Sequence, residues 1–299
     1  MNSLIQGNVL LALAAALMWG GGDFSGGMGV KTVGGSIGGA LRVVLLSHLS
    51  SFTVLLIVAH LQGSPFPHGA VLAWGVAAGC AGGLSLTAFY IALARGAMGA
   101  SAAVSGLLAA AIPAGVSIVR EGSPGLLRLA GFLIAGGAIW LIAAGDSESG
   151  GSDGVSGRRL MGLAVLAGAG FGVYFVALKM AGSVGPIWTM TLSRVGSLSV
   201  CSLMLLGVSL RSGEVCEGKV RIPWVAVRWV LMMALLDTSG NLLFVAATRA
   251  GRLDVAAVLA SLYPASTILL AAWALGERPT GRQGVGMLVA AAAVVMITV

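Results

Sequence analysis

Few side chains in this sequence could do chemistry, and most of those few stand inside long apolar runs. Asp237 and Asn241 are four residues apart in one run, so a helix would place both on the same face. Ser239 and Gly240 lie between them and make a polar patch that suits lipid poorly. Asp237 and Asn241 are therefore predicted to face a cavity and to bind an amine or a proton. A polar contact that holds two helices together is the alternative.

Trp19 and Asp23 have the same spacing in the first apolar run, with three glycines between them. Glycines at these positions would let a neighbouring helix or a solute approach the backbone closely. Asp23 is expected to face a cavity, and the alternative is a place at the membrane boundary with Lys31 as its partner in water. Trp19 is expected either to line a cavity or to pack in the protein core.

Arg42 and Arg194 stand 152 residues apart, and each lies about two turns into its apolar run. An ionised side chain in hydrocarbon costs about 3 kcal/mol, so each needs a partner, a water-filled cavity or a place near the interface. We expect the two arginines to act in gating, to pair with Asp23 or Asp237, or to hold an anionic group such as a carboxylate bidentately. Contact with lipid headgroups is the alternative.

Tyrosine is scarce, and the three tyrosines, Tyr90, Tyr174 and Tyr263, are expected to line the cavity. Tyr263 precedes Pro264, whose missing N–H is expected to break an apolar run near its centre. Pro113 is its counterpart 151 residues earlier. A broken helix exposes carbonyl groups that are tolerated only beside protein or a cavity, so the paired prolines are predicted to mark a solute path. A simple kink, with the carbonyl satisfied by serine or water, is the alternative.

The composition indicates the environment in which these residues must work. Only 9% of the 299 residues are charged and 58% are hydrophobic, whereas a soluble globular protein has about 25% charged residues. So few charges cannot cover a water-facing surface, and lipid must therefore be the main solvent. This balance excludes a soluble enzyme, a disordered chain and a nucleic-acid partner. The net charge of +7 is attributed to membrane topology and not to an anionic partner.

Apolar runs separated by Gly, Pro, Ser and charge clusters predict ten membrane-spanning helices of about 20 residues each. We expect them at residues 8–27, 35–60, 70–93, 100–119, 126–144, 160–181, 186–210, 223–247, 254–275 and 283–299. The predicted fold class is therefore all-α, with ten transmembrane helices. Ten basic residues fall in or near the odd-numbered connections and five in the even-numbered ones, which places the odd-numbered side in the cytoplasm and both termini outside.

The polar segment 146–159 divides the chain into two halves of five spans, residues 1–145 and 160–299. Shifting the sequence by 151 to 154 residues aligns Arg42 with Arg194 and Arg95 with Arg249. This nearly constant shift predicts a duplication with a polar linker between the copies. An odd number of spans in each copy would insert the second copy upside down, giving two inverted five-helix repeats.

Sites for a nucleotide, metal or cofactor have recognisable spacings that this sequence lacks. No Gly-Lys-Thr/Ser sequence occurs that could cradle a phosphate. The three histidines lack the spacing of metal ligands, and the three cysteines lack paired spacing. We expect no metal and no cofactor, so any transport would draw on the gradient of the solute or of a coupled ion.

Several segments of the sequence resemble the drug/metabolite transporter superfamily, in particular its ten-helix EamA-type members. They are Ala16–Phe24, Phe89–Gly96, Leu262-Tyr263-Pro264 and Leu275–Thr280, and the Gly-Glu-Arg turn at 276–278 is the most specific. The sequence departs from the family at Arg120-Glu121-Gly122, which replaces the expected Gly-Glu-Arg order, and in the second connection, which lacks basic residues. The resemblance implies a carrier for small solutes and, as in many members, export of metabolites.

These observations predict a secondary transporter or facilitator that exports a small organic metabolite, such as an amino acid, by alternating access. It would not be an enzyme. An integral-membrane enzyme acting on lipid-linked substrates and a non-transporting membrane scaffold are the alternatives. We expect a multi-pass protein of the plasma or inner membrane, with membrane lipid and the metabolite as partners. A monomer is expected because ten spans suffice to enclose a path, and a dimer is the alternative.

Overall fold

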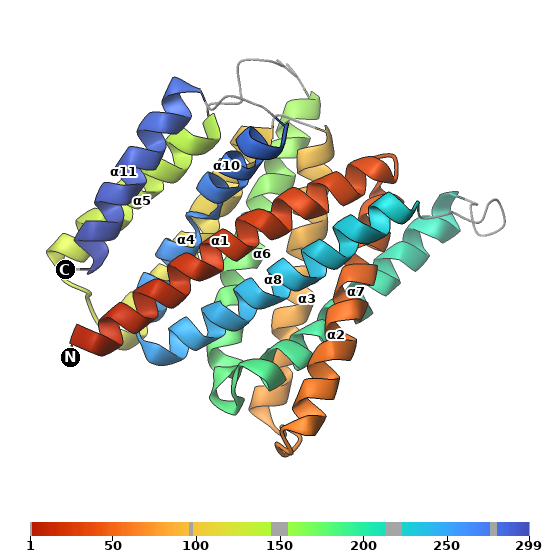
Figure 1. The fold of residues 1–299 in the computed structure, drawn as a ribbon, viewed down its shortest axis with the longest axis horizontal. Coiled ribbons are helices and arrows are strands. Elements are labelled where there is room, and N and C mark those ends of the chain that lie inside the picture. Colours follow the sequence, from red (N-terminus) through yellow and green to blue (C-terminus); the bar gives the residue numbers. More distant parts are fainter. Residues whose placement is uncertain (1, 96–97, 145–154, 213–222, 276–279, 299) are drawn as a thin grey trace.

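The computed structural model describes residues 2–95, 98–144, 155–212, 223–275 and 280–298, and within these ranges the chain is helical with no strand. The helices are α1 (Asn2–Thr32), α2 (Ile37–Leu61), α3 (Ala70–Arg95), α4 (Met98–Glu121), α5 (Leu126–Ala144), α6 (Val155–Ala181), α7 (Pro186–Ser212), α8 (Trp224–Ala250), α9 (Leu253–Ala260), α10 (Tyr263–Leu275) and α11 (Gly281–Thr298), with a short 3₁₀ helix η2 (Gly182–Val184) (Figure 1).

All ten predicted spans fold as helices, which confirms the all-α, multi-pass class. Eight apolar segments of at least 18 residues are long enough to cross a membrane within the described ranges. The helices α5 and α11 are shorter, but 19 and 18 residues still extend about 28 Å, close to the thickness of the hydrocarbon core. The largest difference in bounds is in α1, which begins at Asn2 instead of residue 8 and ends at Thr32.

Local sequence signals start two of the helices. Ser36 caps α2, because its Oγ accepts a hydrogen bond of 3.0 Å from the N–H of Gly39. Thr280 and Gln283 cap α11 reciprocally: the Thr280 N–H donates to Gln283 Oε1 at 2.8 Å, and the Gln283 N–H donates to Thr280 Oγ1 at 3.3 Å. This capping box satisfies N–H groups that would otherwise have no partner at the start of a helix.

The two prolines predicted to break helices behave differently. The ninth span is interrupted at Ser261 and Leu262, directly before Tyr263 and Pro264, so that α9 and α10 are separate helices. The predicted break at Pro113 is wrong, because α4 continues through this residue from Met98 to Glu121. A proline removes one N–H, and α4 packs against α5, α6 and α9, which hold the helix together.

Helices of the two halves pack against one another in matching pairs (Figure 1). The helix α1 packs along α8, and α3 packs along α6; exchanging the first five spans for the last five converts one pair into the other. The contact of α4 with α6 likewise corresponds to that of α9 and α10 with α1. In Figure 1, α5 and α11 lie side by side at one edge, and α2 and α7 lie at the opposite edge. The centre is therefore built from both halves.

Glycine permits the closest of these contacts, between α3 and α7. A Cβ atom added at Gly79 would lie 1.7 Å from the carbonyl oxygen of Ser193, and one added at Gly196 would lie 2.0 Å from that of Val76. Backbone atoms cannot yield as a flexible side chain can. Glycine is thus required where α3 crosses α7, and this crossing sets the position of Arg194, next to Ser193.

Replacing Gly79 with alanine should destabilise the protein, because the new methyl group forces α3 and α7 apart. Overpacking of this kind costs about 1–3 kcal/mol, so the apparent Tm in detergent should fall by about 5 °C. Gly115→Ala is the matched control, because Gly115 lies in α4 with no atom within 4 Å of an added Cβ. This control should keep or slightly raise the Tm, since alanine favours the helix. Equal Tm values for the two variants would contradict the close α3–α7 contact.

Candidate functional site

A buried ion pair joins α7 to α8 near the centre of the molecule. Arg194 Nη2 donates to Asp237 Oδ2 at 2.5 Å and to Thr238 Oγ1 at 3.0 Å. The arginine side chain is only 3% exposed, against 19% for the aspartate. The sequence predicted that Arg194 would pair with Asp23 or Asp237, and the structure brings it to Asp237. This contact gives each charge the partner that a membrane interior demands.

Hydrogen bonds extend the ion pair to α6. Asn241 Nδ2 donates to Asp237 Oδ1 at 3.1 Å and to the Asp237 carbonyl oxygen at 2.7 Å. Tyr174, on α6, donates its hydroxyl hydrogen to Asn241 Oδ1 at 2.7 Å. Both carboxylate oxygens of Asp237 therefore accept a hydrogen bond. The predicted residues Tyr174, Asp237 and Asn241 thus lie in one network with Arg194.

A histidine and a serine add a fourth helix to this site. His48, on α2, is 3% exposed, and its Nδ1 lies 2.5 Å from Ser197 Oγ on α7. The sequence marks His48 as an ionisable group inside an apolar run without assigning it a role, and it does not indicate Ser197. The available signal was a histidine inside an apolar run, six residues after Arg42. The serine carried no signal, because its partner is 149 residues away in the sequence.

The side chains enclose a cavity of about 30 Å³ between helices of both halves. Its polar lining residues are His48, Tyr174, Ser193, Arg194, Ser197 and Asp237. A cavity of this volume holds about two water molecules, whereas sites for organic ligands measure about 300–1,000 Å³. The structure therefore shows a narrow site, which must widen before an organic molecule can enter.

Asp23, Tyr90 and Tyr263 are not among the residues that line this cavity: Asp23 on α1 and Tyr90 on α3 lie near Asp237, and Tyr263 on α10 lies near Asp23. The carboxyl group of Asp23 interacts electrostatically with that of Asp237 and with both tyrosines. Gly22 allows this approach, because a Cβ there would lie only 3.2 Å from the Asp237 backbone nitrogen. Within the described part of the chain Asp23 forms no salt bridge, so the alternative partner Lys31 is not used.

Trp19 packs into the aromatic core and not into the cavity described above. Its ring stacks on Phe175 with a centroid distance of 5.1 Å and an interplanar angle of 5°, and it lies 5.5 Å from Phe244. Gly240 leaves room for the indole, since a Cβ at this position would lie 2.6 Å from it. Of the two roles expected for Trp19, the structure shows core packing.

Arg42 does not share the environment of Arg194, although the two stand at matching positions of the two predicted repeats. Arg42 is half-buried on α2, and among the residues the model describes it forms no ion pair. Of the roles expected for the two arginines, pairing with a central aspartate is seen for Arg194 and not for Arg42 among the described residues. Asp237 has only two carboxylate oxygens, and Arg194 and Asn241 occupy them.

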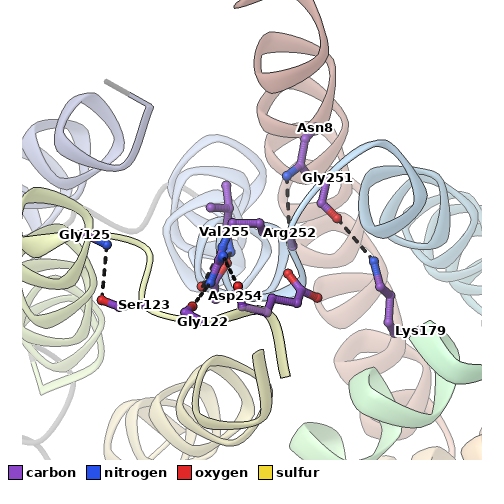
Figure 2. A network of polar contacts seen from close by, with 10 residues as sticks. Asn8, Gly122, Ser123, Gly125, Lys179, Gly251, Arg252, Asp254 and Val255 are labelled. Carbon is purple, nitrogen blue, oxygen red and sulfur yellow. Dashed lines mark hydrogen bonds and ion pairs between the residues drawn. The ribbon is translucent and has the colours of Figure 1, made fainter. Parts of the chain in front are cut away.

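A second polar cluster, which the sequence did not indicate, lies where α8 connects to α9 (Figure 2). Arg252 donates from Nη2 to Asp254 Oδ2 at 2.8 Å and to the Gly122 carbonyl oxygen at 2.7 Å, and from Nη1 to the Glu121 carbonyl oxygen at 3.3 Å. Asp254 is fully buried. Its hydrogen bonds raise the pKa of the Arg252 guanidinium above the ordinary value, so this residue stays charged. We call these residues, with Asn8, Lys179, Thr248 and Gly251, the end cluster.

The other side chains of the end cluster come from α1 and α6. Asn8 Nδ2 donates to the Arg252 carbonyl oxygen at 3.4 Å. Lys179 Nζ donates to the carbonyl oxygens of Thr248 and Gly251, the latter at 3.2 Å. Figure 2 shows Asn8 and Lys179 reaching the α8–α9 connection from different helices. The cluster therefore ties α1, α4 and α6 to one point at this end of the molecule.

These features define a multi-pass helical membrane protein with a narrow, charged site between its two halves. Residues 159–299 match the EamA-like transporter family, and this match places the protein in the drug/metabolite transporter superfamily, as the sequence resemblance implied. A solved crystal structure has the same fold, with a TM-score of 0.73 at 15% identity over 97% of this chain and 95% of that chain. No curated protein matches the sequence. The family consists of transporters, so the protein is a membrane transporter of the drug/metabolite type.

Removing one partner of the central ion pair should cost more than removing both. Arg194→Leu leaves the Asp237 charge buried and unpaired, which costs about 3–5 kcal/mol. The double variant Arg194→Leu/Asp237→Leu removes both charges and should lose less than the sum of the single variants, as measured by unfolding in mixed SDS–lipid micelles. Arg42→Leu is the control and should cost about 1 kcal/mol or less. Strictly additive losses would contradict the ion pair.

Proposed function

We propose that the protein is a secondary transporter or facilitator that exports a small organic metabolite, such as an amino acid, across the plasma or inner membrane. The observation that carries this proposal is the narrow, charged cavity between the two halves, with His48 contributed by α2 and Arg194 and Asp237 by α7 and α8. A charged site is tolerated inside a membrane protein where it serves an ion or solute pathway. One chain surrounds the site, so a monomer suffices.

The cavity favours alternating access over a continuous pore. Its volume of about 30 Å³ admits water but no metabolite, so the helices around it must move before a solute can bind. Residues 1–145 and 160–299, joined by the linker 146–159, act as two inverted repeats that rock about the site. The matching contacts of α1 with α8 and of α3 with α6 support this proposal.

The end cluster closes one end of the proposed path. Its hydrogen bonds link α1 and α4 of the first half to the α8–α9 connection of the second half. Four acceptors are backbone carbonyls at or near the C-terminal ends of α4 and α8, namely those of Glu121, Gly122, Thr248 and Gly251. Water can replace a protein donor at such carbonyls, so the contacts are able to open and re-form.

Transport should depend on the central residues and not on the lipid-facing surface. Vesicles reconstituted with the protein and loaded with the twenty amino acids should release one or more of them, as measured by mass spectrometry. Asp237→Asn combined with Tyr263→Ala should slow this release about tenfold, the effect of one lost charge-assisted hydrogen bond. Leu203→Ala, which alters a side chain 69% exposed on α7, should release at the normal rate.

The result that would contradict this site assignment is normal release by the double variant at equal protein content. Absence of release by the unaltered protein, both here and in a metabolite comparison of cells with and without it, would contradict the transport proposal itself. Circular dichroism and gel filtration of each variant show whether a slow rate reflects misfolding.

Locking the end cluster should stop transport. A Cβ added at Gly251 would lie 3.0 Å from Asn8 Cβ, close to the separation of about 3.5–4.5 Å in a disulfide. Asn8→Cys/Gly251→Cys, in a chain whose Cys80, Cys201 and Cys216 are replaced by alanine, should therefore cross-link on oxidation. The oxidised protein should lose release and regain it on reduction. Each single-cysteine variant is the control, and full release by the cross-linked protein would contradict alternating access at this end.

A further inference from the structure

Two nitrogen atoms of residues that line the central cavity are buried without a hydrogen-bond partner. They are Arg194 Nε and His48 Nε2, and each side chain is about 97% buried, since 3% of each residue is exposed. Burial of an unsatisfied polar atom is unfavourable, and charged groups suffer most. Two such atoms in residues around one cavity indicate a place that a ligand completes.

The chemistry of the two nitrogens defines what they can bind. Arg194 Nε can only donate a hydrogen bond. His48 Nδ1 lies 2.5 Å from Ser197 Oγ, and when Nδ1 accepts the serine hydrogen, Nε2 carries the ring hydrogen and donates. A protonated ring donates from both nitrogens. In both of these states of the ring the unfilled positions are two donors, and their natural partner is an anion.

Asp237 does not fill this position. Its Oδ2 accepts from Arg194 Nη2 and its Oδ1 accepts from Asn241. The guanidinium is a planar fork, so Asp237 occupies the Nη2 corner and leaves Nε for another acceptor. The bidentate grip expected from the sequence thus cannot come from Arg194 alone. His48 supplies the missing second donor.

The size of the cavity and its apolar walls select a carboxylate on an organic molecule. About 30 Å³ suits a group of two oxygen atoms, which occupy the places of two waters. Leu86 and Phe171 also line the cavity and offer an apolar surface to the rest of the solute. Gly79, Gly82 and Gly83 line it from α3.

We propose that His48 Nε2 and Arg194 Nε together hold the carboxylate of the transported solute, so that the substrate class is small organic acids, amino acids included. This inference rests on the proposed function and adds to it the charge of the solute and a specificity-determining role for His48. The Ser197 hydroxyl is a positioning group, because it orients the imidazole through Nδ1.

Four probes of one shape test the proposed subsite in the purified full chain. Leucine and 4-methylpentanoate carry a carboxylate, whereas leucinamide and 4-methylpentanamide carry an amide in its place. Thermal unfolding measured against probe concentration should show stabilisation by both carboxylates and at least tenfold weaker binding of both amides. Equal stabilisation by acids and amides would overturn the proposal, and so would stabilisation by neither acid.

Two amide substitutions isolate the contact of His48. His48→Gln can place an N–H₂ group at the position of Nε2, whereas His48→Asn reaches only the position of Nδ1 and Ser197. We expect binding of 4-methylpentanoate to weaken about threefold in the glutamine variant and about tenfold in the asparagine variant. His60→Asn, at an exposed position of the same helix, is the matched control and should bind normally.

Equal affinities of the two His48 variants, with both folded by circular dichroism, would overturn the role of His48. The binding assay needs no membrane and no transport, so its outcome is separate from the vesicle experiment. Release of amino acids by vesicles together with equal binding of acids and amides would leave the transport proposal standing and remove the carboxylate subsite. Binding of acids without release would support the carboxylate subsite and contradict the transport proposal.

Discussion

The Arg194–Asp237 ion pair is the contact on which the centre of the protein depends. Either charge alone inside a membrane would be costly, so the two helices that carry them must stay in register. The hydrogen bonds of Asn241 and Tyr174 bring α6 to the same place, and His48 with Ser197 brings α2. These polar contacts fix the relative positions of four helices, which apolar packing alone would leave less defined.

Glycine residues allow the helices around the central site to pack closely. Next to the charged residues, α1 approaches α8 closely at Gly22 and α3 approaches α7 closely at Gly79. Without a hydrophobic driving force between helices in lipid, close van der Waals contact is a main source of attraction. Polar residues in the site and glycines at the crossings are therefore two parts of one arrangement: the glycines bring the backbones together, and the charges determine the register.

The sequence predicted the helices well and the site in part, and the difference has a physical cause. Every backbone group in lipid must be satisfied within its own segment, so apolar length alone indicates a span. Asp237 and Asn241 were found because their relation is local to one helix. The His48–Ser197 contact and the end cluster join residues from distant helices, so no local pattern indicates them. The helix break predicted at Pro113 does not occur, because neighbouring helices stabilise a helix that its own sequence disfavours.

The two polar clusters hold their charges differently, and under the proposed alternating access this difference favours opening at the end cluster. Breaking the buried central pair costs about 3–5 kcal/mol, because the remaining charge loses its partner. In the end cluster Arg252 also donates to the exposed backbone carbonyls of Glu121 and Gly122, where water can take the place of a lost donor. Arg252 also keeps Asp254 as its partner while it releases Glu121 and Gly122, since both residues belong to the α8–α9 segment. The end cluster can therefore separate without exposing a bare charge, while the centre stays intact.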